Sequence, residues 1–257
     1  ACSMPYYYCS RSMAYVDSGP PLFAAVRAGD VEALRRELAA GVDPDMHELD
    51  SGAGPTPLFY AVCGPCGQSG IRESLECISV LLEAGASVDL VHSGKTVLHW
   101  IAECESAEFK LIIAALLEAG ADPNFTQTSG PFTGRSVLAL AAQYGSAGAV
   151  RMLISAGAVD LDRALELAIE NGKQRNCTTL LRAGAAIPAA IEFDFTYHHW
   201  RRTVCAYIEK IRTVGSFEAY EKAHRQRLTA IFLPKFPALP VEILERVLEF
   251  TWDIGGH

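Results

Sequence analysis

The stretch Leu116-Leu117-Glu118-Ala119-Gly120-Ala121-Asp122-Pro123-Asn124 decides the fold of this chain, because phrases of the same kind occur five times. A pair of large aliphatic residues followed by a small residue and Gly is typical of a helix that ends in the left-handed conformation, which Gly adopts most easily. Recurrence of one such unit predicts a repeat protein. The other four copies are Ala40-Gly41-Val42-Asp43-Pro44, Leu81-Leu82-Glu83-Ala84-Gly85-Ala86, Leu153-Ile154-Ser155-Ala156-Gly157-Ala158 and Leu180-Leu181-Arg182-Ala183-Gly184-Ala185.

A second phrase precedes each copy of the first. It opens with Thr or Ser in three cases, which suits a helix N-cap, and Pro can follow in the first turn, where no backbone donor is needed. Small Ala residues in this first helix let a second helix lie close to it. Each unit is therefore predicted to be a helix, a turn and a second helix, followed by an exposed loop. The five copies are Pro21-Leu22-Phe23-Ala24-Ala25, Thr56-Pro57-Leu58-Phe59-Tyr60-Ala61, Thr96-Val97-Leu98-His99-Trp100-Ile101-Ala102, Ser136-Val137-Leu138-Ala139-Leu140-Ala141-Ala142 and Ala164-Leu165-Glu166-Leu167-Ala168.

The two phrases together resemble the ankyrin repeat. The resemblance implies an all-α solenoid of about five helix-turn-helix repeats, in which each repeat buries its apolar face against its neighbours. His99 stands where the family uses a hydrogen-bonding anchor for the loop, so a structural role is expected for it. The spacing departs from an ideal period of about 33 residues: the second repeat carries an insertion at 64–70, and residues 158–162 lead almost directly into the fifth repeat without a loop.

The composition limits the classes of function. Half of the residues are hydrophobic and 20% are charged, which is typical of a folded globular chain. No apolar run reaches the roughly 18 residues that a membrane-spanning helix requires. A net charge of −8 argues against general binding of nucleic acid. We find neither a glycine-rich phosphate loop nor a nucleophile motif such as G-x-S-x-G, so the chain is predicted not to be an enzyme, and no cofactor is predicted.

Three regions are expected along the chain. Residues 1–15 show no helical period and are interpreted as a processed end, a cloning remnant or a short loop closed by Cys2 and Cys9. The repeat domain is predicted over 16–192 and a C-terminal helical module over 193–257. Cys177 and Cys205 are interpreted as core thiols of a reducing compartment, which predicts a cytoplasmic location, with the nucleus as a second compartment.

Four cysteines in the middle of the chain suggest two kinds of chemistry. Cys63-Gly64-Pro65-Cys66 has the letters of a thioredoxin-like redox site, but no strand or βαβ unit precedes it. Stacking of the repeats would bring Cys63 near Cys104, and with Cys66 and Cys77 the set could hold zinc tetrahedrally. Because the spacing is irregular, the alternative is that Cys77 and Cys104 are small buried apolar residues, and the preferred interpretation is no metal site.

The expected binding surface is the concave face made by the loops and first helices, on which ankyrin arrays usually hold their partners. Its early loops are acidic, which favours a partner with a basic segment, and aromatic anchors among charges suit a short peptide or a protein edge. A solvated face without a partner is the alternative. The predicted partner-binding residues are Asp45, Glu48, Asp50, Tyr60, His92, Lys95, Trp100, Phe125, Phe132, Arg135 and Tyr144, with Phe59 as a further aromatic residue near the first helices.

The last 60 residues carry a second possible function. Residues 202–213 have helical spacing, and Ser216 can cap a following helix with Phe217, Tyr220, Ala223, Leu228, Ile231 and Phe232 as apolar contacts. A final amphipathic helix is expected over 239–250. Its sequence resembles the opening helix of an F-box, as in the truncated segments that end poxvirus ankyrin proteins, and more loosely the SOCS box. The resemblance implies binding of a Skp-type or elongin/cullin-type adaptor through Leu239, Pro240, Glu242, Ile243, Leu244, Val247 and Leu248.

These observations lead to a non-catalytic protein-recognition module that presents a bound partner to a cullin-RING ubiquitin ligase. The competing interpretation is a scaffold subunit whose C-terminal helices only close the repeat stack. Exposed ends of a solenoid require a cap, and a few amphipathic helices would suffice for that.

Overall fold

The structure is a computed structural model that describes residues 20–48, 54–63, 71–105, 109–189, 199–235, 240 and 242–243. The chain divides into two compact units, Ala1–Asp160 and Leu161–His257, and each is described by itself. The described residues form helices joined by loops. Isolated antiparallel β-bridges pair His92 with Lys95 and Thr126 with Ser136. The predicted all-α architecture is confirmed. The predicted domain limits at 15/16 and 192/193 remain predictions.

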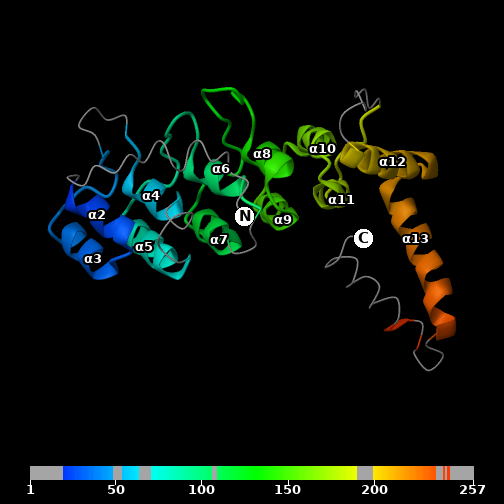
Figure 1. Ribbon diagram of the computed structural model, residues 1–257, viewed down its shortest axis with the longest axis horizontal. Coiled ribbons are helices and arrows are strands. Elements are labelled where there is room, and N and C mark those ends of the chain that lie inside the picture. The colour runs from blue at the N-terminus through cyan, green and yellow to red at the C-terminus, as the bar shows by residue number, and fades with distance from the viewer. Residues whose placement is uncertain are drawn as a thin grey trace. The chain divides into compact units, whose positions relative to one another are not determined.

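The described residues of unit 1 form four helix pairs in two layers (Figure 1). Each first helix contacts the first helix of the next pair, and each second helix contacts the second helix of the next pair. The first helices are α2 (Pro21–Ala28), α4 (Pro57–Cys63), α6 (Val97–Ala102) and α8 (Val137–Tyr144), and the second helices are α3 (Val31–Ala39), α5 (Ile71–Glu83), α7 (Lys110–Glu118) and α9 (Ala147–Ser155).

The repeated phrases explain these boundaries. Ser136 caps α8 by accepting a hydrogen bond from the Ala139 backbone N–H at 3.1 Å. Gly120, which follows α7, has φ +91°, a conformation that residues with a Cβ rarely adopt. The anchor leucines of the four first helices are at most 1% exposed, so they form the core between the layers; they are Leu22, Leu58, Leu98 and Leu138.

One polar contact recurs between successive repeats. In each case a side-chain oxygen at the start of a loop accepts the backbone N–H of the residue two positions after the next repeat's Gly. We call these contacts the repeat latches. They hold one loop in register with the next, and they give a partner to a loop backbone N–H that lies outside the helices. The latches of unit 1 are Asp45–Ser87 (2.8 Å), Asp89–Asp122 (3.1 Å) and Asn124–Val159 (3.0 Å).

The described residues of unit 2 form the fifth helix pair and two longer helices. These are α10 (Leu161–Glu170), α11 (Gln174–Arg182), α12 (His199–Val214) and α13 (Phe217–Phe232), followed by the 3-10 turn η3 (Leu233–Lys235). The start of α10 at Leu161, directly after residues 158–160, agrees with the predicted loss of a loop before the fifth repeat. Asp162 repeats the latch by accepting the Ala186 backbone N–H at 2.7 Å.

The two long helices differ in how they are packed. α12 buries Val204, Cys205, Ile208 and Ile211, as its spacing predicts. Ser216 caps α13, also as predicted, but no residue of α13 is buried, and Ala223 and Ile231 are exposed. In its first turns, α13 is held by Tyr220, which meets Tyr207, and by Glu221, which pairs with Arg182.

Candidate partner-binding surface

Aromatic and charged side chains form a continuous row across the first helices of unit 1 and the loops that precede them. We call this set the inner row. Each member contacts at least one other member, so the row is built by contacts between repeats as well as within them. Its members are Arg27, Glu48, Phe59, Tyr60, His92, Lys95, Trp100, Glu103, Phe132, Arg135, Gln143 and Tyr144.

The row begins at a carboxylate held by two donors. Glu48 accepts the Tyr60 hydroxyl and pairs with Arg27 Nη1 at 2.6 Å. The Arg27 guanidinium also lies over the Tyr60 ring, 5.5 Å from its centroid. Burial raises the pKa of Tyr60, and the bond to Glu48 raises it further. Tyr60 therefore keeps its proton at neutral pH and serves as a donor that ties the loop to α4.

Phe59 connects the second repeat to the third. Its ring makes edge contacts with His92, at 4.8 Å between centroids, and with Trp100, at 5.6 Å. Such edge-to-face pairs stabilise by about 0.5–1.5 kcal/mol each beyond the area that they bury. Burial lowers the pKa of His92, with a smaller effect from His47, so the imidazole is favoured in its neutral form.

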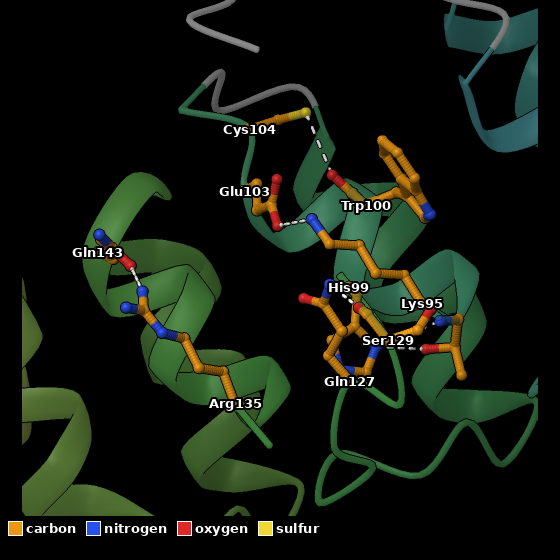
Figure 2. Close-up of polar contacts among 10 residues, drawn as sticks. Lys95, His99, Trp100, Glu103, Cys104, Gln127, Ser129, Arg135 and Gln143 are labelled. Atoms are coloured by element: carbon orange, nitrogen blue, oxygen red, sulfur yellow. Dashed lines mark hydrogen bonds and ion pairs between the residues drawn. The ribbon is translucent and has the colours of Figure 1, made fainter. Parts of the chain in front are cut away.

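A buried ion pair lies at the centre of the row. Lys95, in the loop before α6, pairs with Glu103, which follows α6, and both side chains are only 9% exposed. The Lys95 ammonium also lies 4.8 Å from the centroid of the Trp100 ring and 5.8 Å from that of Phe132. Figure 2 shows the Lys95 side chain running past Trp100 to reach Glu103. Burial raises the pKa of Glu103, although Lys95 acts in the opposite direction.

The fourth repeat uses the same geometry with a neutral acceptor. Arg135, in the loop before α8, donates from Nη1 to Gln143 Oε1, and these two residues are eight positions apart, as are Lys95 and Glu103 (Figure 2). The Arg135 guanidinium lies 4.5 Å over the Phe132 ring, which in turn contacts Tyr144 at 5.9 Å. Burial raises the pKa of Tyr144, which therefore stays protonated.

The loop before α8 is longer than the loop before α6. Seven positions separate Asp89 from Thr96, whereas twelve separate the equivalent Asn124 from Ser136. The additional length carries Phe132 and is held by internal hydrogen bonds, including Gln127 Nε2 to the Ser129 carbonyl at 2.6 Å. The extra loop residues thus place an aromatic ring against two cations of the row.

His99 contacts both the loop before α8, through Phe125, and the start of its own helix, through Thr96. It is fully buried, and its Nδ1 accepts the backbone N–H of Thr96 at 3.3 Å while meeting the Thr96 hydroxyl at 2.8 Å. Its ring meets Phe125 edge-on at 5.9 Å. Burial lowers the pKa of His99 to about 4, and Lys95 lowers it as well. The neutral ring therefore has the structural role expected from its position in the repeat.

The structure brings together most of the residues that the sequence suggested. Glu48, Tyr60, His92, Lys95, Trp100, Phe132, Arg135 and Tyr144 all belong to the inner row. Asp45 does not, because its carboxylate is engaged in a repeat latch, and Phe125 packs on His99 instead of on the row. Asp50 lies outside the described residues.

Three residues of the row escaped the sequence prediction: Arg27, Glu103 and Gln143. They share one register, five positions after the anchor leucines Leu22, Leu98 and Leu138. A polar residue at that register of a buried helix is the signal that could have identified them, since long polar side chains are seldom buried without a partner.

The candidate zinc residues do not come together in the described part of the chain, where no group of three or more potential ligands could hold a metal. Cys63, Cys77 and Cys104 are buried, and Cys66 lies outside the described residues. Burial raises the pKa of Cys77 to about 11, so the thiolate that a metal or a redox reaction requires is disfavoured there.

The predicted adaptor segment is described in part. Pro240, Glu242 and Ile243 are exposed, and Ile243 is 49% exposed. The other predicted residues, Leu239, Leu244, Val247 and Leu248, lie outside the described residues, as does the N-terminal segment 1–15. Among the described helices, none combines the length and apolar character that crossing a bilayer requires.

Comparison with known proteins agrees with this architecture. A family model described as ankyrin repeats (3 copies) matches residues 22–127 and 106–190. SH3 and multiple ankyrin repeat domains protein 1 of Homo sapiens is 33% identical over 106 residues, which make up 41% of this chain and 4% of that protein. SH3 and multiple ankyrin repeat domains protein 2 of Homo sapiens is 31% identical over 101 residues, or 39% of this chain and 5% of that protein. The chain thus matches a small fraction of the length of these relatives. The two repeated phrases, the helix pairs and the matched family model together place this chain in the ankyrin repeat family.

Proposed function

We propose that this chain recognises a protein partner by holding a peptide segment or an exposed loop of it on the inner row. Ankyrin repeats are protein-interaction modules, and no enzymatic family is indicated for the chain. The observation that carries the proposal is the half-exposed state of Trp100, Phe132 and Tyr144, which present aromatic surface while their neighbours hold them in place.

Internal contacts keep these rings in one arrangement before a partner arrives. Lys95 lies against both Trp100 and Phe132, and its own position is determined by Glu103. A surface with fixed rings loses little side-chain entropy on binding, and Trp and Tyr are enriched among residues that dominate binding energy. Rigid aromatic surface flanked by charge suits a segment with one or two apolar side chains.

The test compares two exposed apolar residues from different helix layers. Trp100→Ala should weaken capture of the partner protein at least tenfold in titration, because aromatic anchors of this kind contribute about 2 kcal/mol or more. Leu111→Ala, on α7 of the second layer, is the matched control, since Leu111 is 60% exposed. Partners are captured from lysate by the intact chain and quantified by mass spectrometry. Equal retention by both variants would contradict recognition on the inner row.

We further propose that the segment 239–250 recruits an adaptor of a cullin-RING ubiquitin ligase, so that the captured partner becomes a substrate. The support is the F-box-like sequence together with the exposure of Pro240, Glu242 and Ile243. An apolar residue such as Ile243 that remains accessible is available to a partner helix. This function belongs to the cytoplasm or nucleus, where such ligases act.

The competing proposal is a scaffold whose C-terminal helices only cap the repeats, and the family fits it equally well. A chain truncated after Lys235 separates the two. Loss of a Skp, elongin or cullin component from the captured proteins on truncation would support the ligase role. Retention of all captured partners by a folded truncated chain, with no such component bound to either form, would support the cap and exclude the ligase role.

A further inference from the structure

The charges of the inner row are not balanced at its fourth repeat. Lys95 and Arg135 both lie within 6 Å of the Phe132 ring centroid, and Glu103 pairs with Lys95. Arg135 instead donates to the neutral amide of Gln143, and among the described residues no carboxylate lies within ion-pair distance of it. His92 and His99 add no charge near neutral pH, because burial lowers the pKa of each. The cluster around Phe132 therefore carries one positive charge in excess.

The acidic residues in the described parts of the loops before α4, α6, α8 and α10 are not bonded to Arg135, because each accepts a hydrogen bond from another group of unit 1. Glu48 is held by Arg27 and Tyr60. The others take part in latches, in turns or in a bond to Ser136, and they are Asp43, Asp45, Asp89, Asp122 and Asp160. The acidic loops suggest a basic partner when only the sequence is considered, but Arg135, whose side chain bonds the neutral amide of Gln143, favours a partner with an acidic residue at this point of the row.

We propose that Arg135 receives a carboxylate of the partner, from an Asp or Glu side chain whose neighbouring apolar residue packs against Phe132 and Trp100. This inference rests on the proposed function, since it assigns the chemistry of the segment that the inner row binds. It also explains why the long loop before α8 holds an aromatic ring against a cation.

The geometry of Arg135 suits this role. A guanidinium has five N–H donors in one plane, and the bond to Gln143 uses Nη1. The Arg135 Cζ lies over the Phe132 ring, 4.5 Å from its centroid, and a carboxylate can accept two of the remaining guanidinium donors side by side. The residue is half-buried, which strengthens a charged hydrogen bond relative to one in open water.

A single carboxylate fits better than a phosphate group. The excess at the cluster is one charge, whereas a phosphoryl group carries between one and two negative charges at neutral pH. The chain as a whole carries a net charge of −8, which disfavours highly anionic partners at a distance. A segment with one acidic residue between apolar residues meets both conditions.

A random 12-residue peptide display library, selected on the full chain, tests the proposal without a known partner. The selected peptides are expected to share an Asp or Glu beside an aromatic or aliphatic residue. Arg135→Gln should weaken their binding at least tenfold in fluorescence anisotropy, and replacement of the peptide's Asp or Glu by its amide should cause a similar loss. Combining the two changes should reduce the peptide's affinity little more than either change alone, because both remove the same contact. Arg163→Gln, at an exposed position of α10, is the matched control.

The outcomes separate this inference from the proposed function. Peptides that lose affinity with Trp100→Ala but not with Arg135→Gln, or that share no acidic residue, would overturn the carboxylate contact and leave recognition on the inner row intact. Peptides that bind equally to the wild-type chain, Trp100→Ala and Arg135→Gln would overturn both. Preference for a phosphorylated form of the same peptides would replace the carboxylate by a phosphate and also overturn the inference. A charge exchange, Arg135→Glu with Lys in the peptide, should restore binding if the contact is direct.

Discussion

Lys95 and Glu103 form a buried ion pair across eight residues of sequence, and Arg135 and Gln143 repeat its geometry in the next repeat with a neutral acceptor. Two successive repeats therefore hold a loop cation against the end of a first helix. In the third repeat the cation is neutralised within the chain. In the fourth its charge is available to a partner.

Removal of the Glu103 charge should destabilise unit 1. Glu103→Gln leaves the Lys95 ammonium buried without its carboxylate, and breaking a buried pair in this way costs about 3 kcal/mol. The free energy of urea unfolding measures the loss. Glu76→Gln, which removes half of the exposed Arg72–Glu76 pair, should change it by less than about 0.5 kcal/mol.

A double variant identifies the cause of that loss. Lys95→Met with Glu103→Gln removes the buried cation as well, and most of the stability should return, because an apolar replacement of a buried pair is often neutral. A double variant as unstable as Glu103→Gln alone would show that packing, and not the uncompensated charge, accounts for the effect.

Stability should fall in mild acid because of His99. Its pKa in the folded chain is about 4, against 6.5 in the unfolded chain, so the unfolded chain binds the proton first as the pH falls. The stabilisation is fully present above pH 6.5 and is lost between pH 6.5 and about 4, where the difference amounts to about 3 kcal/mol.

His99→Gln isolates this contribution, since Gln is a common capping-box residue at this position and does not titrate. Unfolding free energies at pH 7.5 and pH 5 should differ less for His99→Gln than for the wild-type chain. The same decrease in both proteins would assign the acid sensitivity to other groups.

The latch at Asp89 requires an acceptor oxygen but no charge. Burial raises the pKa of Asp89, so its neutral form is favoured relative to an exposed carboxyl, and Asn124 performs the same function one repeat later. Asp89→Asn should therefore leave the free energy of unfolding within about 0.5 kcal/mol of wild type, whereas Asp89→Ala should lower it by about 1–2 kcal/mol. A large loss with Asn would indicate that the carboxylate charge itself is needed.

The loops before α6 and α8 approach each other closely at Gly94. A Cβ there would lie 2.3 Å from Ser129 Oγ and 2.6 Å from the Ser129 backbone nitrogen, and φ is +80°. Gly134 has a similar φ of +82° with nothing within 4 Å of a Cβ, so it provides the control for backbone conformation alone. Gly94→Ala should cost at least about 1 kcal/mol more than Gly134→Ala in urea unfolding, because only the former forces the loops apart.

Binding gives a second measurement for the same pair of variants. Gly94→Ala should also weaken capture of the partner, since the loop before α8 carries Phe132 and Arg135. Equal stability and equal binding for the two variants would show that the contact between these loops does not support the inner row.

The sequence alone predicts the repeats, their helix pairs and the residues that fill the core. A helix that ends in Gly and packs on its neighbour through an anchor leucine such as Leu98 uses local signals, and local signals repeat in the sequence. The same signals predict the burial of α12 on one face, because helical spacing fixes which residues share a side. They also identify the aromatic and charged loop residues as candidates for binding.

Tertiary structure decides which of those candidates act together. Asp45 and Glu48 look alike in the sequence, but Asp45 closes a latch with Ser87 while Glu48 joins the inner row through Arg27. The partners lie 42 and 21 residues away, and no local pattern encodes such a pairing. For the same reason the charge of the surface could not be predicted by counting acidic residues. Carboxylates such as that of Asp45 already accept hydrogen bonds inside the fold, and only the packed repeats show that Arg135 has an amide where Lys95 has an acid.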